Sequence, residues 1–267
     1  MLAEYDLTMR SALSAILNTQ LDDTAWQQAS LPIKSGGLGV RSAVQLSASA
    51  FLASVHGADA LVSRIVLGSC LLSQDPLVIR ATQLWNGLVG ANVLLAPSGS
   101  PSLQKSWDAP IVTAWYERVL TSAPDDYSKA RLRAVASPHS GDWLKAIPAA
   151  NLGLRMDNES VRIAVGLRLG TNLCAPFICA CGSQVDACGS HGLSCVKSAG
   201  RQLRHSLVNN EVLKAFSRAG IPATREPTGL IPASALRPDG ATVIPWSQGR
   251  CLAWDVTCPD TRCLAPS

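Results

Sequence analysis

The sequence has little charge and few aromatic side chains. Charged residues make up 16% of its 267 residues and aromatic residues 5%, whereas charged residues usually contribute about 25% of a soluble domain. Such a low charge indicates that neighbouring parts of a larger assembly normally cover some of the surface. The formal net charge of +4 is too small to identify a partner.

Two further absences concern membranes and secretion. No apolar run is long enough to cross a bilayer, because the longest uncharged stretch, 81–104, is interrupted by polar residues and two prolines. The N-terminus is acidic and lacks the basic and apolar regions of a signal peptide. We therefore expect an intracellular protein, nuclear if expressed, with no membrane partner and with nine cysteines held as thiols or metal ligands.

The glycine-rich loop is not a nucleotide-binding loop. Gly36-Gly37-x-Gly39 lacks the lysine and hydroxyl residue that follow the last glycine of a P-loop, and no strong strand precedes it. We expect a structural turn within a longer loop, 26–41. Aromatic residues are scarce, so four tryptophans are the natural core residues of the helical part: Trp85, Trp107, Trp115 and Trp143.

The pattern of apolar residues divides the chain into a long helical part and a short strand-rich part. Helical spacing predicts helices over 4–19, 42–56, 59–72, 76–91, 103–120, 126–136, 157–169 and 201–219. After Gly220, short segments between prolines and glycines predict strands over 221–226, 229–231, 237–239 and 251–258. The expected fold class is therefore mixed, with a mostly α-helical N-terminal two-thirds.

Four potential metal ligands lie within 17 residues. They form the pattern Cys179-x-Cys181-x₉-His191-x₃-Cys195, and three thiolates with one imidazole suit a closed tetrahedral zinc site. Cys188 could replace one of them. The alternative is a set of buried free cysteines beside an unrelated histidine.

Two carboxylates lie on segments that read as neighbouring strands. Asp239 follows Arg237-Pro238, and Asp255 lies in Trp254-Asp255-Val256-Thr257. If the strands pair, both carboxylates can reach one Mg²⁺, which would activate water and neutralise a phosphate, with Glu226 as a third acid. The alternative is that Asp239 caps a turn and Asp255 forms an ordinary ion pair.

Positive charge is concentrated in the helix after the cysteine cluster. From Lys197 to Arg225 the sequence has six Lys/Arg and one acid, Glu211, a local excess that favours phosphate binding. The alternative is a solvated helix face. The apolar face of this helix is expected to comprise Leu203, Leu207, Leu213 and Phe216.

Together these motifs resemble the C-terminal region of non-LTR retrotransposon polyproteins that carry a restriction-like endonuclease. The resemblance implies a zinc knuckle, with Cys179, Cys181, His191 and Cys195 as ligands, before a nuclease domain of the PD-(D/E)xK class. It assigns Asp239 and Asp255 to the metal, and Arg204 and His205 to the basic-His pair of the family. The implied domains are a thumb-like helical part (1–100), a helical connector (101–170), the knuckle (171–198) and a partial α/β nuclease domain (199–267).

Departures from that family limit the expected activity. No Tyr/Phe-x-Asp-Asp polymerase motif occurs, Thr257 stands where the class can place its lysine, and no lysine follows Lys214. We expect a truncated or decayed reading frame with an incomplete nuclease site. Its product is expected to bind DNA and element RNA more than to cleave DNA. Its other expected partner is the missing polymerase portion, and the competing hypothesis is a non-enzymatic zinc module for nucleic acid or protein. The residues expected to contact nucleic acid are Arg201, Arg204, His205, Lys214 and Arg237.

Overall fold

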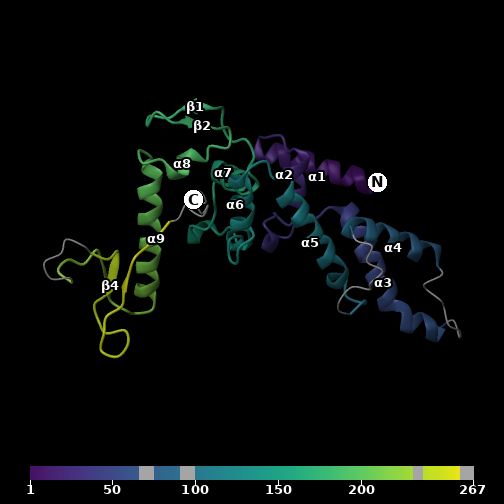
Figure 1. Cartoon of the computed structure of the whole chain (residues 1–267). Helices are drawn as coiled ribbons and strands as arrows, with labels where there is room; N and C mark the ends of the chain where they lie inside the picture. Colours follow the sequence, from purple (N-terminus) through teal and green to yellow (C-terminus); the bar gives the residue numbers. More distant parts are fainter. Residues whose placement is uncertain (66–74, 91–99, 231–236, 259–267) are drawn as a thin grey trace. The chain divides into compact units, whose positions relative to one another are not determined.

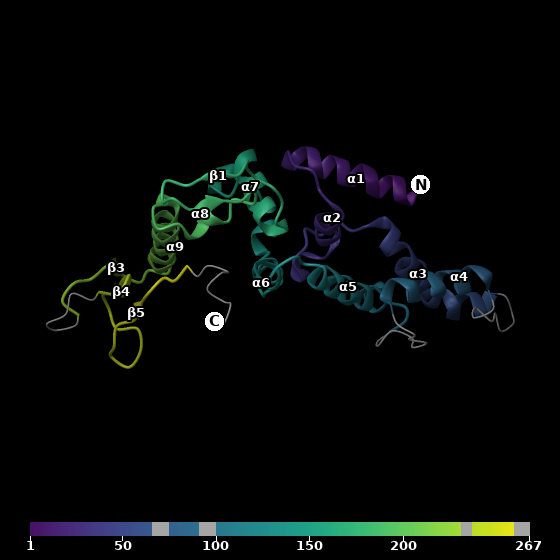
Figure 2. The same ribbon diagram turned by 45° about the horizontal axis from the view of Figure 1, so that its top comes forward.

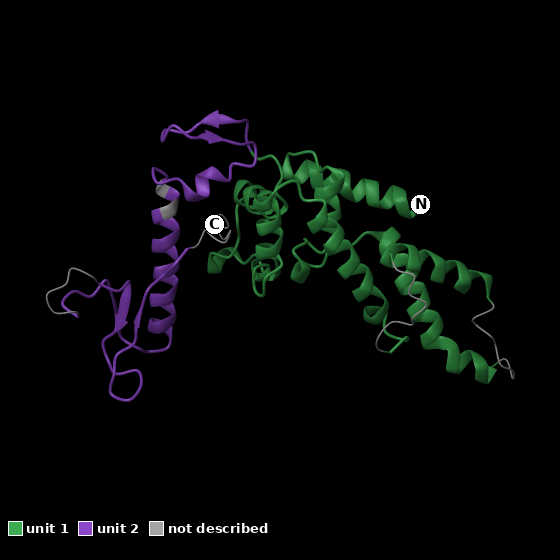
Figure 3. Ribbon diagram, viewed as in Figure 1, with its two compact units in different colours: residues 1–173, 267 green, residues 174–266 purple. Residues whose placement is uncertain are grey.

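The computed structural model describes residues 1–65, 75–90, 100–230 and 237–258, apart from the side chains of Ala199 and Arg201. It divides the chain into two compact units, 1–173 and 174–266 (Figure 3). The first unit is helical, and the second combines helices with two small antiparallel sheets (Figure 1). Among the described residues, no helix combines the length and apolar character needed to cross a membrane.

The first unit contains most of the predicted helices, with similar boundaries. Two expectations are wrong. The segments 42–56 and 59–72 were expected to be separate helices. Up to Ile65 they form one helix, which continues through Gly57 because neighbouring alanine and leucine residues favour it. The start of the expected 26–41 loop is helical, because Asp22 caps it by accepting from the Ala25 amide at 2.7 Å. The α-helices are α1 (Leu2–Leu17), α2 (Asp23–Ser30), α3 (Ala43–Ile65), α4 (Pro76–Val89), α5 (Gln104–Thr121), α6 (Asp126–Val135) and α7 (Asn158–Leu169).

Helices α3, α4 and α5 pack side by side around two tryptophans (Figures 1 and 2). Trp85 and Trp107 are 3% and 5% exposed, and the Trp85 indole donates to the Trp107 carbonyl at 2.8 Å. Trp115 packs against the same core. Trp143 is 36% exposed, so its expected role in the core is wrong: it lies in a short 3₁₀ helix, Asp142–Lys145, rather than on a packed helix face.

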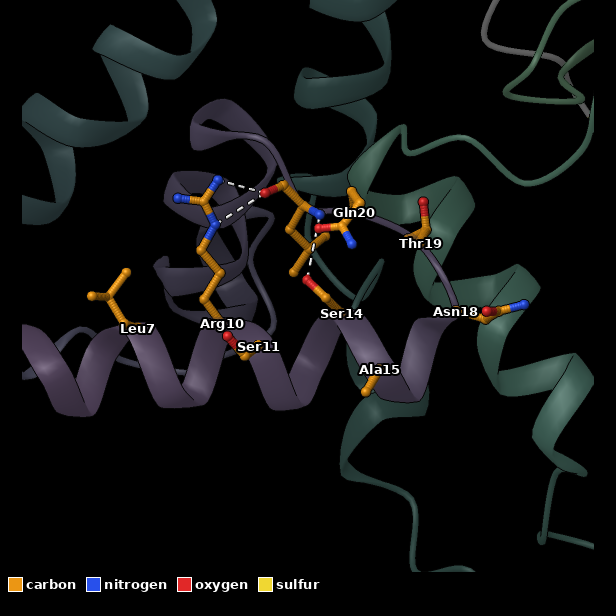
Figure 4. Close-up of a pocket in the computed structure, with 9 residues that line it drawn as sticks. Leu7, Arg10, Ser11, Ser14, Ala15, Asn18, Thr19 and Gln20 are labelled. Carbon is orange, nitrogen blue, oxygen red and sulfur yellow. Dashed lines mark hydrogen bonds between the residues drawn. The ribbon is translucent and has the colours of Figure 1, made fainter.

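A second core joins α1, α2 and α7, and Leu17, Ala29 and Leu169 are its most buried members. A pocket lies beside the C-terminal end of α1 (Figure 4). Its polar groups hold the chain together, because Arg10 Nε donates to the Leu21 carbonyl at 3.0 Å and Ser14 accepts from the Leu21 amide. We therefore assign this pocket a structural role.

The glycine-rich loop is a structural turn, as predicted. The 3₁₀ helix η1 (Ile33–Ser35) ends at Gly36, whose φ of 85° places it in the left-handed region. The amides of Gly36, Gly37 and Gly39 donate to carbonyls within the same segment. No phosphate can therefore be cradled by these amides as in a P-loop.

The second unit is built around one long helix. Its elements are β1 (Phe177–Ile178), β2 (Gln184–Val185), α8 (His191–Ser194), α9 (Ala199–Arg218), β3 (Ala223–Arg225), β4 (Gly240–Thr242) and β5 (Ala253–Trp254). The last three strands form an antiparallel sheet in the order β3-β4-β5, beside α9 (Figure 2).

The strands are shorter than the sequence predicts. Residues 237–239 precede β4 instead of forming a strand, and the segment expected at 251–258 is extended in the sheet only at Ala253–Trp254. Gly229 and Leu230 form no strand, and Ile231 lies outside the described residues. Three short strands and one helix are consistent with a small α/β unit, and the restriction-like fold stays a prediction.

Helix α9 packs through only part of the predicted apolar face. Leu203 and Leu207 are 58% and 54% exposed, whereas Asn209, which was not predicted, is 1% exposed. The Trp254 indole donates to Asn209 Oδ1 at 3.0 Å, and Phe216 stacks on Trp254 with 4.9 Å between ring centroids. The hydrogen bond between Asn209 and Trp254 therefore determines which face of α9 packs against the sheet.

Candidate metal centre and the Asp239 network

A tight hairpin presents the first two potential ligands. Strands β1 and β2 pair with Phe177 opposite Val185, and the turn between them contains Cys179 and Cys181. The Cys179 amide donates to the Ser183 carbonyl at 2.9 Å, and the Gly182 amide donates to the Cys179 carbonyl at 2.8 Å. Gly182 has a φ of 89°, which a residue with a Cβ rarely adopts. This turn brings both thiols to one side of the hairpin.

The other two potential ligands come from the turn of helix that follows. Asp186 orders the approach to α8, because its carboxylate accepts from the amide and hydroxyl of Ser190, each at 3.3 Å. His191 begins α8, and the Cys195 amide donates to the His191 carbonyl at 2.9 Å. One helical turn therefore places the imidazole and the Cys195 thiol on the same side.

The four ligand atoms converge on one point. Those of Cys179, Cys181, His191 and Cys195 all lie within 4.8 Å of one another. The sulfurs of Cys179 and Cys195 are 3.7 Å apart, and Cys181 Sγ is 3.2 Å from His191 Nε2. A tetrahedral zinc with Zn–S bonds of about 2.3 Å holds two sulfurs about 3.8 Å apart, far beyond the ~2.05 Å of a disulfide. These residues could hold a metal ion such as zinc.

The surroundings favour the thiolate form of one ligand. Hydrogen bonds from the hydroxyl and amide of Ser183 lower the pKa of Cys181 to about 6. For Cys195 the Lys197 amide lowers the pKa, but burial and the adjacent Cys179 and Cys181 thiols outweigh it, so that this pKa is raised. Thiolates are the form that binds metal, and a bound cation would stabilise them further.

Cys188, which the sequence left open as a replacement ligand, is not a member of this group. Within the described residues, these four are the one cluster of three or more His, Cys, Asp or Glu side chains close enough to hold a metal.

Two basic side chains fasten the cluster instead of projecting freely. The Lys197 ammonium donates to the Ala180 carbonyl at 2.9 Å. The Arg204 guanidinium, on α9, donates to the Leu193 carbonyl in α8. Arg204 therefore joins α9 to the metal module, a role that the sequence did not predict.

The two predicted carboxylates lie together at the end of the β4–β5 ladder. Gly240 pairs with Trp254 and Ala241 with Ala253, so Asp239 and Asp255 come next along the same register. The Asp239 amide donates to Asp255 Oδ1 at 3.2 Å, and the Val256 amide donates to Asp239 Oδ2 at 2.6 Å. The strand pairing that this site requires is present.

Helix α9 reaches the same aspartate. His205 Nε2 lies 3.0 Å from Asp239 Oδ2, and Asn209 Nδ2 donates to the Asp239 carbonyl at 3.0 Å. Asn209 was not predicted as a site residue, although its spacing of four residues from His205 places both on one helix face. We call Asp239, Asp255, His205 and Asn209 the Asp239 network.

The remaining predicted site residues lie around this network or away from it. Glu226 has its amide bonded to the Asp239 carbonyl, but its carboxylate pairs with Arg237 at 2.8 Å. Lys214 pairs with Glu211 at 2.7 Å on the exposed side of α9, and the Arg201 side chain lies outside the described part. In that part, Asp239, Asp255 and Glu226 are not grouped as metal ligands, so Mg²⁺ binding stays a prediction.

Comparisons with protein families, with curated proteins and with solved structures found no match for this chain.

Gly240→Ala is expected to destabilise the sheet beside the Asp239 network. A Cβ at Gly240 would lie 2.1 Å from the indole of Trp254, so the indole would move and weaken its bond to Asn209. Overpacking of this kind costs about 1–3 kcal/mol, measurable as a lower urea midpoint of the full chain. Gly192→Ala is the control, because no heavy atom lies within 4 Å of its added Cβ. Equal midpoints for both variants would contradict the expectation.

Proposed function

We propose that this chain binds nucleic acid through a zinc-stabilised module and the basic helix α9. The observation that carries the proposal is the convergence of Cys179, Cys181, His191 and Cys195 at separations suited to tetrahedral zinc. A segment with so few buried side chains needs a metal to hold its shape. The resemblance to non-LTR retrotransposon polyproteins supplies the expected partners, DNA and element RNA, and a nuclear location.

The basic residues divide into two roles under this proposal. Arg204 and Lys197 fasten the metal module, while exposed side chains farther along α9 meet phosphate. Lys214 remains available because its exposed pair with Glu211 is weak, and Arg218 has no ion-pair partner among the described residues. His205 and Arg237, engaged with Asp239 and Glu226, are candidates for contacts that form only after rearrangement.

Binding of duplex DNA by the full chain tests this division. Wild-type protein loaded with one zinc ion is expected to lose affinity steeply as salt rises, and Lys214→Ala/Arg218→Ala is expected to lower the slope of log K against log salt. Each lost phosphate contact reduces that slope by ~0.9. Arg80→Ala/Lys105→Ala removes two exposed charges from the first unit as a control. An affinity for DNA that does not change with salt, or that is unchanged after complete zinc removal, would count against the proposal.

A second candidate function is DNA cleavage, favoured by the cross-strand position of Asp239 and Asp255. We propose that this nuclease site lacks a lysine of its class at position 257, which is threonine. Supercoiled plasmid with Mg²⁺ or Mn²⁺ is expected to stay intact. Robust nicking that Asp239→Ala abolishes would refute the incomplete site and establish an active nuclease. If zinc-loaded wild-type protein binds no DNA, a non-enzymatic protein-binding module becomes the better explanation.

A further inference from the structure

A pocket in the first unit gathers two cations and several hydroxyl groups. It occupies about 460 Å³ and lies where η1, α5 and the end of α6 meet. Lys34 and Ser35 come from η1, immediately before the glycines that the sequence singled out. The remaining lining residues are Val112, Thr113, Tyr116, Arg133, Ala136 and Ser137.

The two cations have no carboxylate to neutralise them. Lys34 and Arg133 form no ion pair within the described residues. Burial and the Glu117 carboxylate raise the pKa of Tyr116, while Arg133 lowers it. The pocket therefore presents a net positive charge.

Two hydroxyls remain able to donate to a ligand. Thr113 and Ser137 already donate to the carbonyls of Ala109 and Arg133. The hydroxyls of Ser35 and Tyr116 make no hydrogen bond to any described residue. With the ammonium of Lys34 and the guanidinium of Arg133, the pocket thus offers donors and positive charge of the kind that phosphate oxygens require.

A buried arginine holds the backbone segments that contribute to the pocket. Arg168, which is 4% exposed, donates to the carbonyls of Ile33 at 2.8 Å, Gly37 at 3.1 Å and Ser140 at 3.2 Å. These bonds tie both ends of the η1 turn to the segment that follows α6. The backbone segments next to Lys34 and Arg133 are therefore held in place before any ligand arrives, which lowers the entropic cost of binding.

The end of α6 does not present bare carbonyls to an anion. The Ser137 hydroxyl donates to the Arg133 carbonyl at 3.0 Å, and the Ser140 hydroxyl donates to the Val135 carbonyl at 2.6 Å. The amides of the neighbouring glycine turn are used internally. Side chains, not backbone amides, must therefore hold the ligand.

We propose that this pocket binds a phosphate group through Lys34 and Arg133, with Ser35 and Tyr116 as additional donors. The phosphate belongs either to a nucleic-acid backbone or to a free phosphate compound. The pocket shares no residue with the metal module, so the proposal does not depend on zinc binding.

Titration calorimetry of the full chain with pyrophosphate, in phosphate-free buffer, tests the site. Wild-type protein is expected to bind, and Lys34→Ala/Arg133→Ala to bind at least tenfold more weakly. Arg80→Ala/Lys105→Ala, which removes two exposed charges elsewhere in the unit, is the matched control and is expected to retain wild-type affinity. Circular dichroism of each variant checks that the helices remain folded.

Competition identifies the source of the phosphate. A single-stranded oligothymidine that displaces pyrophosphate, and that itself binds Lys34→Ala/Arg133→Ala more weakly, supports the site and assigns it to nucleic acid. Pyrophosphate binding without such competition supports the site and assigns it to a free phosphate compound. No pyrophosphate binding by wild-type protein, or equal loss in both double variants, overturns the proposal.

Discussion

Cys181→Ser is expected to abolish zinc binding and to unfold the metal module. The change removes one of four converging ligands, and it removes the thiolate whose pKa Ser183 lowers to about 6. A structural zinc contributes about 10–16 kcal/mol in small zinc modules. Between Cys174 and Ser198 only Val185, Ser190 and Cys195 are buried, too little to replace that contribution. Native mass spectrometry should show a fall from one zinc per chain to none.

The matched control is Cys174→Ser, because the Cys174 thiol faces the carbonyls of Asp186 and Ala187 and lies outside the ligand group. This variant should keep one zinc. Amide exchange resolves the structural effect: Cys181→Ser should expose the β1–β2 hairpin and α8 while α3–α5 stay protected. Full zinc content in Cys181→Ser, or its loss in Cys174→Ser, would disprove the assigned ligands.

The metal cluster could be predicted from the sequence because its geometry is local. The hairpin turn at Gly182 and one turn of helix suffice to bring four ligands together. The N-terminal starts of helices were predictable for the same reason, because the N-cap residues Asp75, Asp125 and Asp157 accept from amides two or three residues ahead in the chain. The sequence left the pairing that places Asp239 beside Asp255 as a condition, and the structure shows β4 and β5 paired next to both residues.

Contacts between distant segments could not be predicted in this way. Apolar spacing assigned Leu203 and Leu207 to the packed face of α9, but Asn209 occupies it because it satisfies both Trp254 and the Asp239 carbonyl. Nothing local indicates those partners, which lie 30 and 45 residues away. The same limit concealed the bond from Arg204 to the Leu193 carbonyl, because the sequence assigned Arg204 to nucleic-acid contact.

Arg168→Ala is expected to destabilise the first unit by about 3–5 kcal/mol. The guanidinium is buried and bonds three carbonyls more than 25 residues away in sequence, and each buried acceptor left without a donor costs about 1–3 kcal/mol. Gln28 and Arg131 both donate to the Arg168 carbonyl, so loosening α7 at this point also disturbs α2 and α6. Urea unfolding of the full chain should show a markedly lower midpoint.

Arg162→Ala separates this effect from the loss of any arginine on α7. Arg162 pairs with Glu159 three residues away and donates to the Leu173 carbonyl at 3.3 Å, so a loss of about 1–2 kcal/mol is expected. Similar losses in both variants would contradict the central role of Arg168. Arg168→Lys adds a functional test, because an ammonium cannot reach all three carbonyls. If it folds, the η1 turn should be loosened and pyrophosphate affinity should fall while Lys34 and Arg133 are both intact. Unchanged affinity would show that the pocket keeps its shape without this arginine.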